Sequence, residues 1–172
     1  MRIGVVSDTH LPRFGRVLPR ELRNGLTAAS VDLILHLGDF TSPEAADLFE
    51  AIAPFDAVAG NNDPPELVER FGRRKSVDVG GIRIGMTHGD LGVGRSSPER
   101  AVRSFSTDEL DVILFGHSHI PVLRRLADGP WLMNPGSPTD RRGEPRYSWG
   151  LIEIAPSGEV APELRFYDDR RP

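Results

Sequence analysis

The chain of 172 residues contains no cysteine. This absence excludes a disulfide framework, a thiol nucleophile, an iron–sulfur cluster and every zinc site built from thiolates. Any metal ion bound by this chain must therefore take its ligands from histidine, aspartate, glutamate or asparagine side chains.

Long apolar runs and an excess of basic charge are also missing. No stretch approaches the roughly 20 apolar residues that cross a bilayer, and the N-terminus lacks the apolar region of a signal peptide. We therefore expect a cytoplasmic protein without a membrane partner. The net charge of −4 provides no global positive field, so we expect no long nucleic acid as a partner.

The length is that of one domain, which we place over residues 1–172, because domains usually run to about 100–200 residues. In the first part of the chain, short apolar runs at 2–6, 31–35 and 55–59 alternate with amphipathic stretches. The stretches run from Glu21 to Ala29 and from the capping residue Ser42 to Ala51. This alternation predicts an α/β sheet with a parallel N-terminal portion.

The second part of the chain is richer in predicted strands. The pattern predicts a hairpin of 76–79 and 82–86 around two glycines, a helix from Ser97 to about Ser106, and a strand at 111–115. Four further strands, separated by Gly and Pro turns, are expected to form an antiparallel meander: 122–126, 131–133, 149–154 and 163–167.

Five successive apolar runs end in a polar cluster at their carboxyl ends, where α/β sheets bind ligands. Together these clusters contain all five histidines, Asp8, Asp39 and Asn61. Side chains two positions apart at a strand end project to the same side. The ligand types and positions predict a metal site built from Asp8, His10, Asp39, Asn61, His88, His117 and His119.

Seven nitrogen and oxygen ligands without sulfur fit two borderline divalent ions bridged by a carboxylate. We expect manganese, with nickel, iron and zinc as alternatives. Two such ions, less two carboxylates and a bridging hydroxide, keep a net positive charge that attracts a phosphate ester. The expected partner is therefore a small phosphoester substrate.

Five ordered blocks resemble those of the calcineurin-like metallophosphoesterases: Asp8-x-His10, Gly38-Asp39, Gly60-Asn61-x-Asp63, His88-Gly89 and Gly116-His117-Ser118-His119. The short length and the segment 134–137 resemble the small bacterial and archaeal phosphodiesterase branch, which is similar to the retromer subunit Vps29. The resemblance implies a four-layer α/β/β/α sandwich of mixed sheets with a dinuclear metal centre at its rim.

The resemblance also implies roles for the site residues. It assigns Asp8, His10 and His119 to one ion, Asn61, His88 and His117 to the other, and Asp39 as the bridge. It implies a phosphodiesterase in which a metal-bridging hydroxide attacks phosphorus. The catalytic residues would be Asp39, Asn61, Asn62 and His117.

Two positions depart from the family pattern. Many members have a histidine where this chain has Asn62, which cannot protonate a leaving group, so we expect a bias toward good leaving groups. Members often have a second histidine in the fourth block, where this chain has Asp90, whose role the sequence leaves open.

Several alternatives stay open at this point. The alternatives to a phosphodiesterase are a phosphomonoesterase or nucleotidase, and a Vps29-like interaction scaffold with vestigial activity. Asp63 is either a structural brace or part of the site, and Arg141 and Arg142 either clamp a phosphate or face solvent. We expect a structural role for His36 and hold a slight preference for a homodimer.

Overall fold

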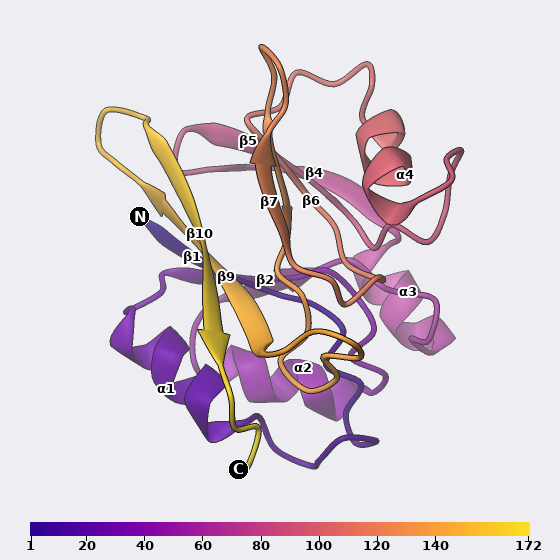
Figure 1. Cartoon of the computed structure of the whole chain (residues 1–172), viewed down its shortest axis with the longest axis vertical. Helices are drawn as coiled ribbons and strands as arrows, with labels where there is room; N and C mark the ends of the chain where they lie inside the picture. The colour runs from indigo at the N-terminus through magenta and orange to yellow at the C-terminus, as the bar shows by residue number, and fades with distance from the viewer.

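Ten strands form two five-stranded sheets in the computed structural model, which describes residues 1–172 (Figure 1). The first sheet contains β1 (Arg2–Val6), β2 (Leu33–His36), β3 (Phe55–Ala57), β9 (Tyr147–Ile154) and β10 (Val160–Tyr167). The second contains β4 (Arg74–Val79), β5 (Ile82–Thr87), β6 (Val112–Leu114), β7 (Val122–Arg125) and β8 (Trp131–Asn134). The helices are α1 (Arg20–Ala28), α2 (Pro43–Glu50), α3 (Pro65–Phe71) and α4 (Ser97–Ser104).

Both sheets are mixed and have three parallel strands. The first has the order β10-β9-β1-β2-β3, in which β1, β2 and β3 are parallel and β9 runs antiparallel to β1. The second has the order β4-β5-β6-β8-β7, in which β5, β6 and β8 are parallel. Each sheet therefore offers an edge where several carboxyl ends meet.

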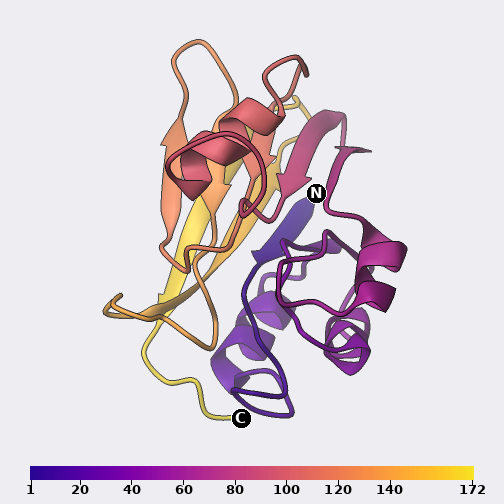
Figure 2. The same cartoon turned by 90° about the vertical axis from the view of Figure 1, so that its right-hand side faces the viewer.

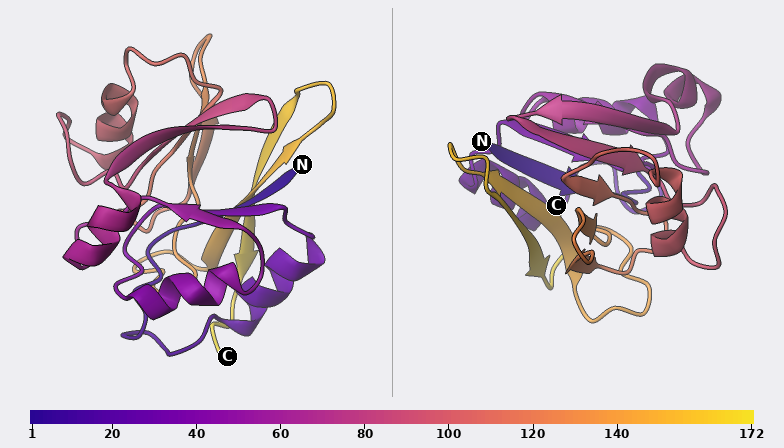
Figure 3. Two further views of the ribbon diagram at one scale, coloured as in Figure 1. Left: turned by 180° about the vertical axis from the view of Figure 1, so that it is seen from behind. Right: turned by 90° about the horizontal axis from the view of Figure 1, so that it is seen from above.

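Three apolar cores separate four layers (Figures 2 and 3). One core joins α1, α2 and α3 to the outer face of the first sheet, through Leu22, Phe49 and Leu67 among others. A second fills the space between the sheets, and a third joins α4 to the second sheet. The expected α/β/β/α sandwich is confirmed. No helix is long and apolar enough to span a membrane.

The helix starts follow local sequence signals. Ser42 caps α2, as predicted, and its hydroxyl accepts a hydrogen bond from the Ala45 backbone at 3.3 Å. Helix α4 begins with Ser96 as its cap, one residue before the expected Ser97. Helix α3 lacks a side-chain cap and was not expected from the sequence, although Pro65 suits its first position.

The antiparallel meander expected near the C-terminus is wrong. Strands β7 and β8 form a hairpin in the second sheet, whereas β9 and β10 pair with each other in the first sheet. The segment 135–146 carries the chain from one sheet to the other. Alternation within a strand indicates which side chains are buried but does not indicate which sheet receives the strand.

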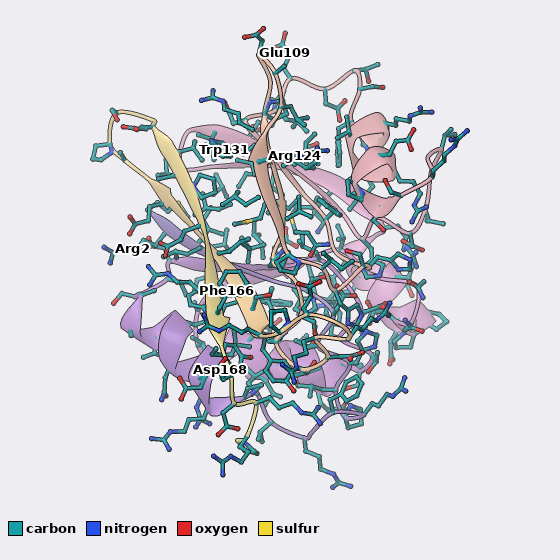
Figure 4. The ribbon with its side chains drawn as sticks, in the orientation of Figure 1. Arg2, Glu109, Arg124, Trp131, Phe166 and Asp168 are labelled. Carbon is teal, nitrogen blue, oxygen red and sulfur yellow. The ribbon has the colours of Figure 1, made fainter.

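Phe49 tests the first core. Its side chain is fully buried, and its ring stacks on Phe55 with 5.7 Å between centroids. We expect Phe49→Ala to lower the free energy of unfolding by about 3–5 kcal/mol because it leaves a cavity. Phe166, 42% exposed on β10 (Figure 4), gives the control Phe166→Ala, for which we expect a loss below about 1 kcal/mol. Urea denaturation measures both, and equal losses would contradict this account of the core.

Candidate metal centre

The seven predicted ligands lie together where the carboxyl ends of parallel strands from both sheets meet. Asp8 and His10 follow β1, Asp39 follows β2, Asn61 follows β3, His88 follows β5, and His117 and His119 follow β6. Backbone hydrogen bonds join the first two loops: Asp8 N donates to Gly38 O at 3.0 Å and His10 N to Asp39 O at 2.8 Å. Parallel pairing of β1 with β2 therefore places both carboxylates at one edge.

One group of ligand atoms gathers around Asp8. Its Oδ1 lies 3.4 Å from His119 Nε2 and 4.0 Å from both His10 Nε2 and His88 Nε2. The two nitrogens of His10 and His119 are 3.4 Å apart, and all three side chains of this group are buried. Asp8, His10 and His119 therefore form a compact set that can hold one ion.

A second group adjoins the first through Asp39. Its Oδ2 lies 3.4 Å from His88 Nε2 and 3.6 Å from His10 Nε2, so the carboxylate reaches both groups. His117 Nδ1 lies 3.0 Å from Asn61 Oδ1, and its ring contacts that of His88 with 5.2 Å between centroids. Asn61 is the most exposed of the seven and marks the open side of the centre.

Backbone carbonyls orient two of the imidazoles. His88 Nδ1–H donates to Leu37 O at 2.7 Å, and His119 Nδ1–H donates to Asp140 O at 2.6 Å. Each bond occupies Nδ1 and directs Nε2 toward the carboxylates, the arrangement found around metal-binding histidines.

Two buried polar atoms at the middle of the centre have no hydrogen-bond partner: Asp8 Oδ1 and His88 Nε2. An unpaired buried acceptor costs about 1–3 kcal/mol, and more when it is charged. A divalent cation takes carboxylate oxygens and imidazole nitrogens as ligands, so the donor set fits such an ion.

The pKa values of the buried ligands show how closely the charged groups of the centre are packed. Burial raises the pKa of Asp8 to about 7. Burial lowers the pKa of His88, but the Asp39 and Asp8 carboxylates outweigh it and raise that pKa to about 9. Burial lowers the pKa of His119 to about 4, which keeps this imidazole neutral and able to bind a cation.

Five of the seven candidate ligands have a left-handed backbone. Their φ values are 56° for Asp8, 45° for His10, 60° for Asp39, 68° for His117 and 61° for His119. This conformation is uncommon outside glycine and persists only where surrounding contacts enforce it. The chain thus turns sharply at each strand end and directs the side chain toward the shared space.

Two positions of the centre require glycine because other atoms approach their backbone too closely for a side chain. A Cβ atom on Gly60 would lie 2.1 Å from Asp39 Oδ1, and one on Gly116 would lie 1.9 Å from Ser7 Oγ. Ser7 Oγ in turn donates to Asp8 Oδ2 at 2.7 Å. Any side chain at either glycine would displace the carboxylate or the residue that orients it.

The residues after Asn61 hold the Asp39 loop. Asn62 donates from its backbone to Asp39 Oδ1 at 2.8 Å and from its side chain to Asp39 Oδ2 at 2.6 Å. Asp63 accepts from the backbone N–H groups of Asp39, Thr41 and Gly60 at 2.8, 2.6 and 2.7 Å. Of the two roles left open for Asp63, its contacts are those of the structural brace.

His36 is buried and neutral beneath the centre. Gly38 N donates to its Nδ1 at 3.1 Å, and its Nε2 lies 3.1 Å from Thr9 Oγ1. Burial keeps its pKa well below the usual value. These contacts link the loops that follow β1 and β2, in agreement with the structural role expected for His36.

Asp90 and Arg73 connect the two sheets beside the centre. The Arg73 guanidinium pairs with Asp90 and donates to Gly60 O at 2.6 Å, next to Asn61. Asp90 therefore has its charge matched within the protein. Nothing in the sequence indicated this pairing, because Arg73 lies in the loop before β4 and Asp90 lies in the loop after β5.

The loop after β8 supports the opposite side of the centre and was only partly foreseen. Ser137 Oγ donates to Asp8 O at 2.8 Å, and Thr139 Oγ1 donates to Thr9 O at 2.7 Å. Asn134 Nδ2 donates to Gly116 O at 2.9 Å. The segment 134–137, which forms part of the family resemblance, had drawn attention to this loop. No sequence signal indicated the contact of Asp140 with His119.

Asp63→Asn tests the brace. The amide keeps the shape of the side chain but places an N–H₂ group against backbone donors, so we expect about 1–3 kcal/mol loss of unfolding free energy. Asp78, whose side chain is 74% exposed, supplies the control Asp78→Asn, with an expected change within about 0.5 kcal/mol. Chemical denaturation of the metal-free protein measures both, and an unchanged Asp63→Asn stability would refute the bracing role.

Comparisons with known proteins agree with this geometry. The calcineurin-like phosphoesterase superfamily domain matches residues 1–157. A probable metallophosphoesterase of Methanothermobacter thermautotrophicus is 35% identical over 139 residues, which cover 81% of this chain and 78% of the relative.

Two solved structures share the fold. Vps29 of Entamoeba histolytica complexed with zinc has a TM-score of 0.77 at 22% identity, over 96% of this chain and 99% of the other. An archaeal phosphodiesterase has a TM-score of 0.71 at 24% identity, over 96% and 100%. The expected family and fold are confirmed, and the chain belongs to the calcineurin-like phosphoesterase superfamily.

Proposed function

We propose that this protein is a dimetal phosphodiesterase. The observation that carries the proposal is the gathering of five buried carboxylate and imidazole side chains in two adjoining groups, those of Asp8, His10, Asp39, His88 and His119. Two of their atoms, Asp8 Oδ1 and His88 Nε2, are left without a hydrogen-bond partner by the protein itself. Membership of a phosphoesterase superfamily supplies the reaction class, which is hydrolysis of a phosphoric ester.

In this proposal Asp39 would be a ligand of both of two divalent ions, with manganese as the expected metal. Asp8, His10 and His119 would hold one ion, while Asn61, His88 and His117 would hold the other. Supporting this division, the Asp39 carboxylate lies 3.6 Å from His10 Nε2 and 3.4 Å from His88 Nε2. When bound, two such ions supply an activated water and positive charge for the phosphoryl group.

The protein's own contribution is to fix the ligands before substrate arrives. Asn62 and the Asp63 brace hold Asp39, and the carbonyls of Leu37 and Asp140 orient the rings of His88 and His119. Such preorganisation means that little rearrangement is needed when the phosphoryl group becomes more negative. Asn61 is a neutral ligand, so the ion beside it would keep more of its positive charge than with a third carboxylate.

Asn62 determines the expected leaving-group preference. Its side chain is an amide with no proton to transfer, and its N–H₂ group is engaged by Asp39. The leaving oxygen therefore departs without a general acid from this position. We infer that the enzyme favours esters of acidic alcohols, aryl esters above all.

Two other functions remain as alternatives. A phosphomonoesterase or nucleotidase would use the same centre and would hydrolyse aryl monoesters faster than aryl diesters. An interaction scaffold is suggested by the shared fold with Vps29, and it would keep bound metal without hydrolysing either class. The cytoplasmic location and the preference for a homodimer remain predictions from the sequence.

Metal loading tests the proposal directly. We expect chelator-treated protein to bind two manganese ions per chain in calorimetry and to hydrolyse bis(p-nitrophenyl) phosphate only after loading. His117→Ala and Asp39→Ala should each bind one manganese ion or none. Each should also lower kcat/KM by at least about 100-fold. Asp78→Ala is the control, because Asp78 is an exposed residue of β4, and it should keep both the bound ions and the activity. No turnover under any metal loading would eliminate the phosphodiesterase.

A series of methyl aryl phosphates with increasingly basic leaving groups tests the role of Asn62. General acid catalysis contributes about 10²–10⁴-fold in enzymes that possess it. We therefore expect kcat/KM to fall steeply as the pKa of the leaving alcohol rises, with alkyl diesters nearly inert. A flat dependence would mean that another residue protonates the leaving oxygen.

A further inference from the structure

Three arginines and one aromatic ring lie on the outer side of the His10–His119 pair. We name this set, Arg13, Phe14, Arg142 and Arg170, the basic ledge. Its foundation is the stacked pair of His10 and His119, whose ring centroids are 5.2 Å apart at an interplanar angle of 28°. The ledge thus adjoins the half of the centre built on Asp8.

Phe14 carries one side of the ledge. Its ring meets His10 edge-on, with 6.1 Å between centroids. The guanidinium carbons of Arg13 and Arg170 lie 5.2 and 5.4 Å from the centre of the Phe14 ring. Cation–π contacts of this kind orient a guanidinium and leave its N–H donors available to a ligand.

Asp140 carries the other side. Its Oδ2 lies 3.4 Å from His119 Nδ1 and 3.9 Å from Arg142 Nε, so it tethers the Arg142 side chain next to the centre. That side chain is 57% exposed. Arg170 closes the ring of contacts, because its Nη1 donates to Thr139 O at 3.0 Å, one residue before Asp140.

The positive charge of the ledge is largely unmatched. No carboxylate lies within ion-pair distance of Arg13 or Arg170. The nearby carboxylate of Asp168, at the end of β10 (Figure 4), is paired with Arg146 at 3.0 Å. Asp140 is the one acidic group in contact with the ledge.

Three separate segments bring these residues together. Figures 1 and 2 show the loop between β1 and α1 and the C-terminal tail at the same end of the molecule, with the segment between β8 and β9 above them. The ledge therefore depends on the folded chain as a whole. A local run of basic sequence would not produce it.

We propose that the basic ledge binds a second phosphate group of the substrate, so that the preferred substrates are diesters carrying a further phosphate beside the scissile one. Guanidinium groups suit this role because they bind phosphate oxygens through two parallel N–H donors. The inference rests on the proposed phosphodiesterase and adds its substrate class. The scissile phosphate occupies the dimetal centre, and the second phosphate lies against Arg142, Arg13 and Arg170.

A matched substrate pair tests the ledge. The p-nitrophenyl ester of thymidine 5′-phosphate is compared with the same ester carrying a 3′-phosphate. With manganese-loaded enzyme we expect the 3′-phosphate to lower KM about tenfold with little change in kcat, since charge-assisted hydrogen bonds hold the added phosphate in the bound substrate. Added salt should reduce the preference.

Variants locate the effect. Arg142→Ala and Arg170→Ala should each reduce the KM preference for the phosphorylated ester toward one. Arg125→Ala is the matched control, because Arg125 also lies over an aromatic ring, Trp131, with its guanidinium carbon 5.9 Å from the ring centre. Trp131 begins β8, whereas the segment that contains Arg142 leaves from the other end of that strand (Figure 4). The control should keep the full preference.

The outcomes separate the two proposals. Hydrolysis of both esters without a preference, or with one that survives in the Arg142 and Arg170 variants, overturns the ledge and leaves the phosphodiesterase intact. If neither ester is hydrolysed, calorimetry compares thymidine 3′,5′-bisphosphate with thymidine 5′-phosphate. If the bisphosphate binds more tightly than the monophosphate and Arg142→Ala removes this difference, the result supports the ledge without the phosphodiesterase. Equal binding of the two nucleotides overturns the ledge.

Discussion

Two carboxylates buried side by side at the meeting edge of two sheets constrain this molecule more than any other feature. Asp8 and Asp39 are almost inaccessible to water, and a buried charge without compensation is strongly unfavourable. The protein supplies hydrogen-bond donors to their outer oxygens, from Ser7, His117 N and Asn62. The inner Asp8 Oδ1 receives none, which leaves cation binding as the natural means of stabilising the site.

Rigidity around these carboxylates comes from contacts between loops. The Asp63 carboxylate gathers three backbone N–H groups, and Arg73 joins the Asn61 turn to Asp90 on the other sheet. These links hold ligand residues in left-handed conformations that each cost free energy. The stability of the surrounding sandwich therefore sustains a centre that is locally unfavourable until a cation is present.

The features that could be predicted from the sequence are those that depend on neighbouring residues. Polar clusters after apolar runs marked every strand end at the centre, and the Ser42-Pro43 pair marked the start of α2. Contacts across the fold were beyond local pattern: the division of the last four strands between the sheets, the Arg73–Asp90 pair, and the bond from His119 to Asp140 O. Helix α3 was missed because it has only seven residues, begins with Pro65 directly after Pro64, and lacks a side-chain cap.

Strand β1 has consequences for how the chain folds. It lies in the middle of the first sheet, and the partner on one of its sides is β9, with the Met1 amine donating to Ile154 O across 153 positions of sequence. Joining such distant segments requires closure of a very long loop, and folding slows as contacts become more distant in sequence. During synthesis, β1 keeps one open edge until β9 has emerged from the ribosome. The strand that leads into the first ligands thus gains its second neighbour only after the segments of all the other ligands have been made.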